Sequence, residues 1–150
     1  MRVIAIGATG FIGRDVVAKL AEAGHEVTVL HRGKTPLPAR RGVTEIHGER
    51  STIREMRSEF FAWSPEVVVD MILSSAAQAR ATLEAFRGIA RRVVAISSAD
   101  VYRAMAVVHR LDSGPAGAGF IDREFAITNA DAGIYAGSPR RGACCFSVDR

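Results

Sequence analysis

The chain alternates between short apolar runs and longer amphipathic stretches. Short runs that predict strands occupy residues 2–6, 26–31, 43–47, 66–73 and 92–97, and the β-branched run at residues 2–6 is typical of a strand buried in a parallel sheet. Stretches with apolar residues at helical spacing occupy residues 11–23, 51–61 and 76–90. Gly24 stands where a helix C-cap glycine belongs, and Ser51 is a candidate N-cap for the second helix. In that helix the inward positions are Ile53, Met56 and Phe60.

Strands that alternate with helices predict an α/β fold built from right-handed βαβ units. We expect a doubly wound parallel sheet of the Rossmann type, truncated to about five strands in the order 3-2-1-4-5. After Tyr102 the pattern fades, and from Asn129 onward neither period 2 nor period 3.6 is visible. The truncated sheet should leave its fifth strand as an exposed edge, which invites a homodimer or aggregation.

Composition excludes several classes of protein. No apolar run approaches the ~20 residues of a membrane span, and the N-terminus does not resemble a signal peptide, so we expect a cytoplasmic protein. The net charge of +4 comes from scattered arginines rather than a basic stripe, which disfavours nucleic-acid binding. The adjacent Cys144 and Cys145 make neither a relaxed disulfide nor a zinc site, and we predict no metal site.

The most informative motif is a glycine loop, GATGFIG, between the first strand and the first helix. Gly7 allows the tight turn, Gly10 lets the backbone approach a pyrophosphate, and Gly13 lets the helix pack closely against the sheet. The helix N-terminus supplies N–H groups and partial positive charge for phosphates. A strand before the loop and a helix after it favour dinucleotide binding over a plain turn. The candidate contacts are Gly7, Thr9, Gly10, Phe11, Ile12 and Gly13.

With its G-x-x-G-x-x-G spacing, this loop resembles that of the extended short-chain dehydrogenases/reductases, the NAD-dependent epimerase/dehydratase family. The resemblance runs from Met1 to about Tyr102. It implies an NAD(P)-dependent oxidoreductase, epimerase or dehydratase acting on a nucleotide sugar or a small carbonyl compound.

The end of the second predicted strand bears on the choice of dinucleotide. An acidic residue there would bind the ribose 2′-hydroxyl of NAD, but this chain has Arg32 and Lys34 in that region. Arg32, helped by Lys34 or Arg14, could hold the 2′-phosphate of NADP. An ordinary basic loop is nearly as good an explanation, so NADP is weakly preferred and NAD stays open.

Further residues gain roles from the family resemblance. A carboxylate after the third strand often meets the adenine ring in that family, and Glu49 is its counterpart here. Ser74 follows the fourth strand near the place of the cofactor ribose, although capping the next helix explains Ser74 and Ser75 equally well. The segment from Ser97 to Tyr102 resembles the Ser-Ser-x-x-Val-Tyr signature, in which Ser98 would hydrogen-bond the reacting oxygen.

The rest of the family's catalytic machinery, a Tyr-x-x-x-Lys pair, is absent. Tyr135 is followed four residues later by Pro139, and no lysine follows Lys34. We therefore divide the chain into a partial dinucleotide-binding domain, residues 1–114, and an irregular tail, residues 115–150, which does not resemble the family's sequence. Either the chain is a fragment or frameshifted product of an enzyme, inactive by itself, or it is a non-catalytic dinucleotide sensor or regulator. An RNA-binding role is a third, weaker alternative.

Overall fold

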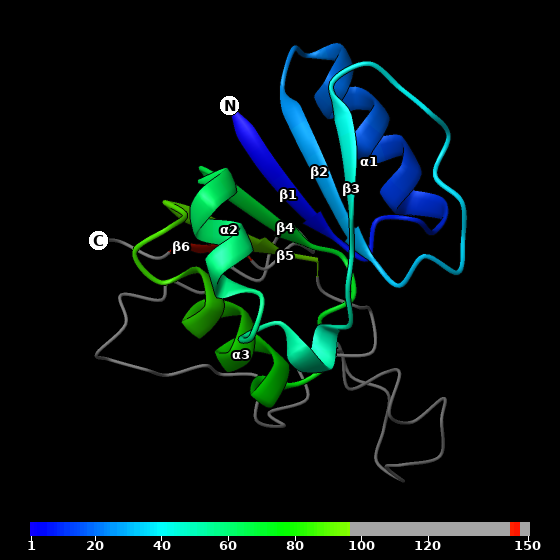
Figure 1. Cartoon of the computed structure of the whole chain (residues 1–150). Helices are drawn as coiled ribbons and strands as arrows, with labels where there is room; N and C mark the ends of the chain where they lie inside the picture. Colours follow the sequence, from blue (N-terminus) through cyan, green and yellow to red (C-terminus); the bar gives the residue numbers. More distant parts are fainter. Residues whose placement is uncertain (97–144, 148–150) are drawn as a thin grey trace, which may run out of the picture.

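A six-stranded sheet organises the computed structural model, in which residues 1–96 and 145–147 are described (Figure 1). The strand order is β3-β2-β1-β4-β5-β6. The first five strands pair in parallel, which confirms the predicted order 3-2-1-4-5. The strands are β1 (Arg2–Ile6), β2 (Glu26–His31), β3 (Val43–His47), β4 (Val67–Asp70), β5 (Arg92–Ala95) and β6 (Cys145–Ser147). The helices are α1 (Phe11–Glu22), α2 (Arg57–Trp63) and α3 (Ala76–Phe86), with a 3₁₀ turn at Arg50–Thr52.

Helices cover both faces of the sheet, as a doubly wound fold requires (Figure 1). Side chains of β1 alternate between the two layers: Ile4 and Ile6 pack with α2 and α3, whereas Ala5 packs with Val17 of α1. This alternation follows from the period of two along a strand. The apolar run of β1 is therefore buried on both faces, which explains its near-continuous hydrophobicity.

The second predicted helix differs from the structure. The chain forms the 3₁₀ turn and further turns, and the helix α2 begins only at Arg57, so Ser51 makes no capping hydrogen bond. Its neighbour Arg50 is instead drawn to a buried carboxylate of β4, so tertiary contact overrides helix propensity here. The prediction that Ile53, Met56 and Phe60 face inward is correct, because all three are buried.

The C-terminal end of the chain also departs from expectation. Residues 145–147 form β6, which pairs antiparallel with β5, Val93 lying opposite Phe146. The prediction of an exposed β5 edge is therefore wrong. The expectation of dimerisation through that edge loses its basis as well. Three residues are too few to produce a recognisable period, and an open strand edge readily accepts such a partner. The boundary at residue 114 stays a prediction.

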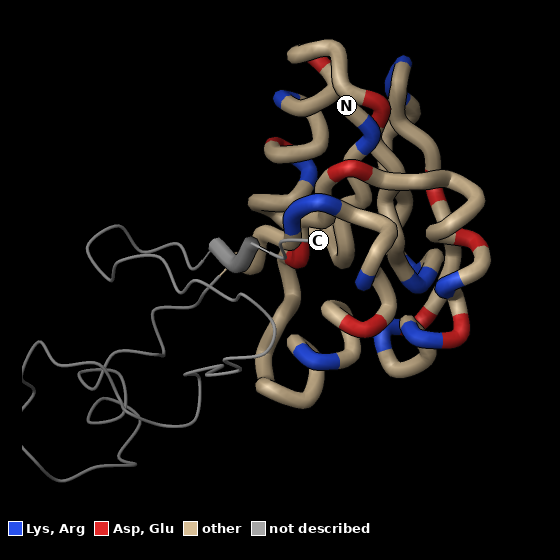
Figure 2. The backbone as a smooth tube through the Cα atoms, turned by 90° about the vertical axis from the view of Figure 1, so that its left-hand side faces the viewer, with Lys and Arg blue, Asp and Glu red and all other residues tan. Residues whose placement is uncertain are grey.

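Charges are mixed over the described part of the chain. Basic and acidic positions are interspersed along the backbone in Figure 2, as the scattered arginines of the sequence led us to expect. None of the described helices combines the length and the apolar character that a membrane span needs.

Two neighbouring phenylalanines test the packing of α2. Phe60 is fully buried and stacks on Phe86 of α3, with ring centroids 4.4 Å apart, whereas Phe61 is 68% exposed. Because it opens a cavity, Phe60→Ala should lower the free energy of unfolding by about 3–5 kcal/mol. The control Phe61→Ala should change it by less than about 0.5 kcal/mol. Urea denaturation measures both, and similar losses in the two variants would contradict this placement of α2.

Candidate functional site

The turn after β1 is shaped by Gly7. Its φ of +71° lies in the left-handed region, and its N–H donates to the carbonyl of Leu30 at 2.9 Å. A Cβ on Gly7 would lie 2.7 Å from side-chain carbons of Ile72, which follows β4. The conformation therefore requires glycine, as the tight turn of the predicted loop demands, and a Cβ would in addition displace the side chain of Ile72.

Gly13 sets the distance between helix α1 and the turn. A Cβ at this position would lie 2.5 Å from the backbone of Ala8, and Gly13 is buried on the inner side of the helix. Backbone cannot yield at such a distance, so any side chain would push the first turn of α1 outward. This matches the close-packing role predicted for the third glycine.

Gly10 differs from Gly7 and Gly13 in the space around it. It is the N-cap of α1 with a φ of −79°, and none of the described atoms lies within 4 Å of a Cβ built on it. Within the described residues no side chain caps this helix, and its first turn contains no acidic residue. The N–H groups at the start of α1 thus meet an open space beside a residue without a side chain. That arrangement suits the pyrophosphate of a dinucleotide.

The remaining residues of the loop line its outer side. The carbonyl of Thr9 accepts a hydrogen bond from Nε of Arg14 at 2.9 Å, and Thr9 itself is half-buried. Phe11 is 91% exposed, and Ile12 is also exposed. Ile72, the residue packed against Gly7, is a third exposed apolar side chain. The loop therefore combines open N–H groups with an apolar rim.

The two basic candidates lie directly after β2. Arg32 and Lys34 are both exposed, and Gly33 between them has a φ of +73°. Arg14 joins this segment to the glycine loop, because its guanidinium also donates to the carbonyl of Pro36 at 3.4 Å. The cationic side chains therefore project from a segment that is tied to the start of α1.

Sequence reasoning missed an ion pair beneath the loop after β3. Both guanidinium NH₂ groups of Arg50 donate to the carboxylate of Asp70, at 2.8 and 2.7 Å, and Asp70 is completely buried at the end of β4. Thr82 of α3 donates to the same carboxylate at 3.1 Å. The exposed Glu49 immediately precedes Arg50, so this pair fixes where Glu49 lies. A carboxylate ending the apolar run VVVD was the available signal.

The two serines after β4 act at the start of α3. Ser75 is the N-cap, and its hydroxyl accepts from the N–H of Gln78 at 3.2 Å. The exposed Ser74 donates through its N–H and its hydroxyl to the side-chain oxygen of Gln78, at 2.9 and 3.0 Å. Ser75 is therefore the cap of α3, whereas Ser74 bonds only the side chain of Gln78, and its place near the cofactor ribose stays a prediction. The candidate catalytic Ser98 lies outside the described residues.

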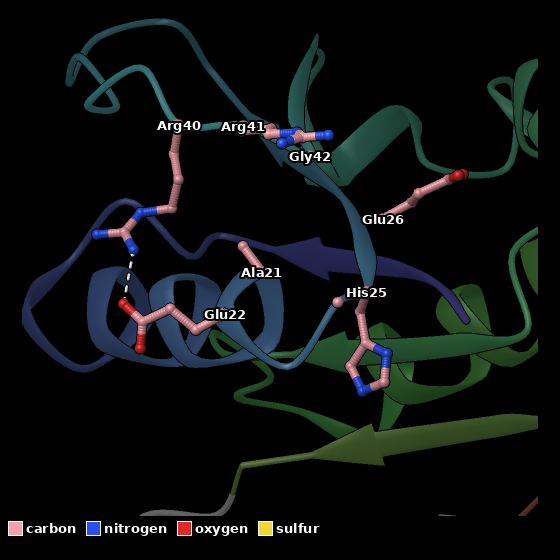
Figure 3. Close-up of a pocket in the computed structure, with 8 residues that line it drawn as sticks. Ala21, Glu22, His25, Glu26, Arg40, Arg41 and Gly42 are labelled. Atoms are coloured by element: carbon pink, nitrogen blue, oxygen red, sulfur yellow. Dashed lines mark hydrogen bonds and ion pairs between the residues drawn. The ribbon is translucent and has the colours of Figure 1, made fainter.

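A shallow hollow of about 540 Å³ lies at the opposite end of the sheet (Figure 3). It is lined by Glu22 and His25 near the end of α1 and by Arg40, which bonds Glu22 at 2.8 Å. Ligands of open α/β sheets bind at the carboxyl ends of the strands. This hollow lies at the amino end of β2 and is not the candidate nucleotide site.

Comparison with known proteins identifies the family. Residues 7–127 match the family described as NAD(P)H-binding, so the match begins at the first glycine of the loop. The chain belongs to this family. As an NAD(P)-binding Rossmann domain, it has the glycine loop and the strand order that the sequence predicted.

One relative is similar in sequence, and solved structures share the fold. The chain is 36% identical over 98 residues to a 2′-dehydrokanamycin reductase of Streptomyces kanamyceticus, covering 65% of this chain and 28% of the reductase. The fold matches that of the Bordetella bronchiseptica enzyme WbmG in complex with NAD, with a TM-score of 0.59 and 18% identity, over 67% of this chain and 38% of WbmG. It also matches UDP-glucose 4-epimerase of Thermotoga maritima, with a TM-score of 0.57 and 20% identity, over 68% and 39%. The chain thus spans well under half the length of these proteins.

The contrast between Gly10 and Gly13 gives a stability test. Gly13→Ala should lower the free energy of unfolding by about 1–3 kcal/mol or more, because its Cβ meets the backbone of Ala8. Gly10→Ala should cost under about 1 kcal/mol, since only the N-cap preference is lost. Urea denaturation compares the two variants, and an equal or larger loss for Gly10→Ala would contradict the geometry of the loop.

Proposed function

We propose that this chain is the nucleotide-binding part of a reductase- or epimerase-like protein, and that Gly7, Gly10 and Gly13 hold the pyrophosphate of NADP(H) or NAD(H). The observation that carries the proposal is the open N-terminus of α1 at Gly10. Gly7 is required by the turn and Gly13 by packing, whereas nothing within the described residues requires glycine at position 10. A ligand backbone approaching the helix N-terminus does require it.

The neighbouring residues would complete the cofactor site. Thr9, Phe11 and Ile12 would contact the pyrophosphate region, Glu49 the adenine side, and Ser74 the ribose. A bound nicotinamide cofactor would supply hydride transfer. The chain's own contribution is to fix the position of that cofactor: α1 offers N–H donors, and Arg50 together with Asp70 holds the Glu49 segment in place.

The family resemblance and the similar proteins support a proposed substrate class. A nucleotide sugar or a small carbonyl compound fits a group that includes a 2′-dehydrokanamycin reductase and a UDP-glucose 4-epimerase. Ser98 would then bind the reacting oxygen. The second candidate function is a dinucleotide sensor without catalysis, which the lack of a Tyr-x-x-x-Lys pair among these 150 residues favours.

Cofactor binding is the first prediction of this proposal. Titrating NADPH or NADH into the folded chain should give a saturable change in cofactor fluorescence. Gly10→Val should abolish it, because the side chain fills the space that the pyrophosphate needs. Circular dichroism verifies that the variant is folded. A folded wild type that binds neither cofactor would overturn the proposal.

Cofactor choice is the second prediction. We expect NADPH to bind more tightly than NADH, because Arg32 and Lys34 are exposed cations where an acid would otherwise contact the ribose. Arg32→Ala should weaken NADPH binding by about tenfold, the low end for a charge-assisted hydrogen bond, and leave NADH binding unchanged. Arg41→Ala, at the far end of the same loop, is the matched control. Tighter NADH binding by the wild type, or no effect of Arg32→Ala, would refute the preference.

The third prediction concerns catalysis by this 150-residue polypeptide. We expect little or no turnover of cofactor with nucleotide sugars or small carbonyl compounds. General acid–base catalysis contributes about 10²- to 10⁴-fold, and the Tyr-x-x-x-Lys pair that would perform it is missing from these 150 residues. Absorbance at the reduced-nicotinamide band measures turnover. Robust turnover that disappears in Ser98→Ala would show that another residue has taken the role of the base.

A further inference from the structure

Three metal-ligating side chains meet on one face of the sheet, at the carboxyl ends of β2 and β3. His31 ends β2, His47 ends β3, and the two residues are directly opposite each other in the parallel register. Glu45 lies two residues before His47 and therefore on the same face. Sequence reasoning missed this cluster because its histidines are sixteen residues apart and only the strand register brings them together.

The donor atoms of the cluster are close together. Nε2 of His31 lies 2.6 Å from Oε2 of Glu45, and Nε2 of His47 lies 3.5 Å from the same oxygen. One ligand atom from each of the three residues falls within 4.8 Å of the others. The imidazole rings of the two histidines stand edge to face, with their centroids 4.9 Å apart. The three side chains thus form one cluster, in which Oε2 of Glu45 lies near a ring nitrogen of each histidine.

Exposure to solvent increases across the cluster from His31 to His47. The His31 side chain is 5% exposed, that of Glu45 is 38% exposed and that of His47 is 67% exposed. A cation could therefore enter from solvent on the His47 side and reach a ligand fixed in the protein interior. Only Glu45 and His47 would have to adjust, and both have the freedom to do so.

We propose that His31, Glu45 and His47 bind a divalent transition-metal ion, Zn²⁺ being the best fit to two imidazole nitrogens and one carboxylate oxygen. Ligands about 2.0–2.1 Å from a tetrahedral ion are about 3.3 Å apart. The pair of His47 and Glu45, at 3.5 Å, already has that spacing, whereas His31 and Glu45, at 2.6 Å, are too close. The three donors lie within 4.8 Å of one another, so shifts of roughly 1–2 Å in the Glu45 and His47 side chains bring all of them to that spacing. A solvent molecule would take the fourth position on the exposed side. This site does not depend on the proposed cofactor function.

Binding of a metal ion would affect the segment after β2 through Nδ1, the second ring nitrogen of His31. The N–H of Gly33 donates to Nδ1 of His31 at 3.3 Å, which leaves the proton on Nε2. Binding a metal through Nε2 moves that proton to Nδ1, and Gly33 can then no longer donate to it. Binding of the ion would therefore break the hydrogen bond of the Gly33 N–H, a loss that the amide resonance of Gly33 reports.

The test is a titration of the metal-free full chain with Zn²⁺ in competition with a chromophoric chelator, followed by Co²⁺, whose visible absorption reports tetrahedral coordination. We expect one ion per chain, the tetrahedral Co²⁺ spectrum, and a shift of the Gly33 amide. His47→Gln and Glu45→Gln should each weaken Zn²⁺ binding at least about tenfold. These two partly exposed positions are chosen because a substitution of the buried His31 risks unfolding the chain.

Two controls separate this site from other ligands. His25→Gln changes a histidine at the opposite end of β2, beside the N-terminal amine, and should leave the affinity unchanged. Cys144→Ser/Cys145→Ser removes the only thiols of the chain and should also leave it unchanged. Absence of stoichiometric binding by the folded protein would overturn the proposal. So would binding that survives both His47→Gln and Glu45→Gln, or that disappears with the cysteines.

Discussion

The contact between Gly13 and the backbone of Ala8 is the constraint on which the candidate site depends. At 2.5 Å from a built Cβ, this contact leaves no room for a side chain, so the first turn of α1 rests directly on the turn that leaves β1. The apolar strand β1, buried between both helical layers, holds the other side of that turn in place. As a result the N–H groups of α1 are presented at the carboxyl end of the sheet, in the open space next to Gly10. Binding there needs little further ordering of the protein.

The buried pair of Arg50 and Asp70 has a different role. Burying such a pair adds little net stability, because desolvation offsets the attraction, but breaking it would leave an uncompensated buried charge. Its consequence here is positional: it ties the turn after β3 to the end of β4, and Thr82 ties the same carboxylate to α3. The segments that flank the glycine loop thus share one anchor, and Ile72, just after Asp70, packs against Gly7.

Local sequence patterns predicted most of the strands and helices. Most of the features that they missed depend on which residues the fold brings together from different strands and loops. Residues 2–6, 26–31 and 43–47 were predicted at the bounds that the structure has, because each is a short run with β-branched residues next to a glycine or a turn. The glycine loop was recognisable because all of its glycines lie within seven consecutive residues. The Arg50–Asp70 pair and the cluster of His31, Glu45 and His47 join residues from different strands or loops, and single-sequence periodicity contains no such pairing. The contact between Arg50 and Asp70 also explains why residues 51–56 form a 3₁₀ turn and further turns rather than an α-helix.

The central claim is that the glycine loop holds the dinucleotide pyrophosphate, and amide chemical-shift mapping tests it most directly. NADPH is titrated into the ¹⁵N-labelled chain, and the amide shifts are followed residue by residue. The account predicts that the largest saturable changes fall on residues 7–14, with a second group at residues 32–34. Changes centred on the hollow around His25 and Arg40, or no saturable change in a folded sample, would contradict it.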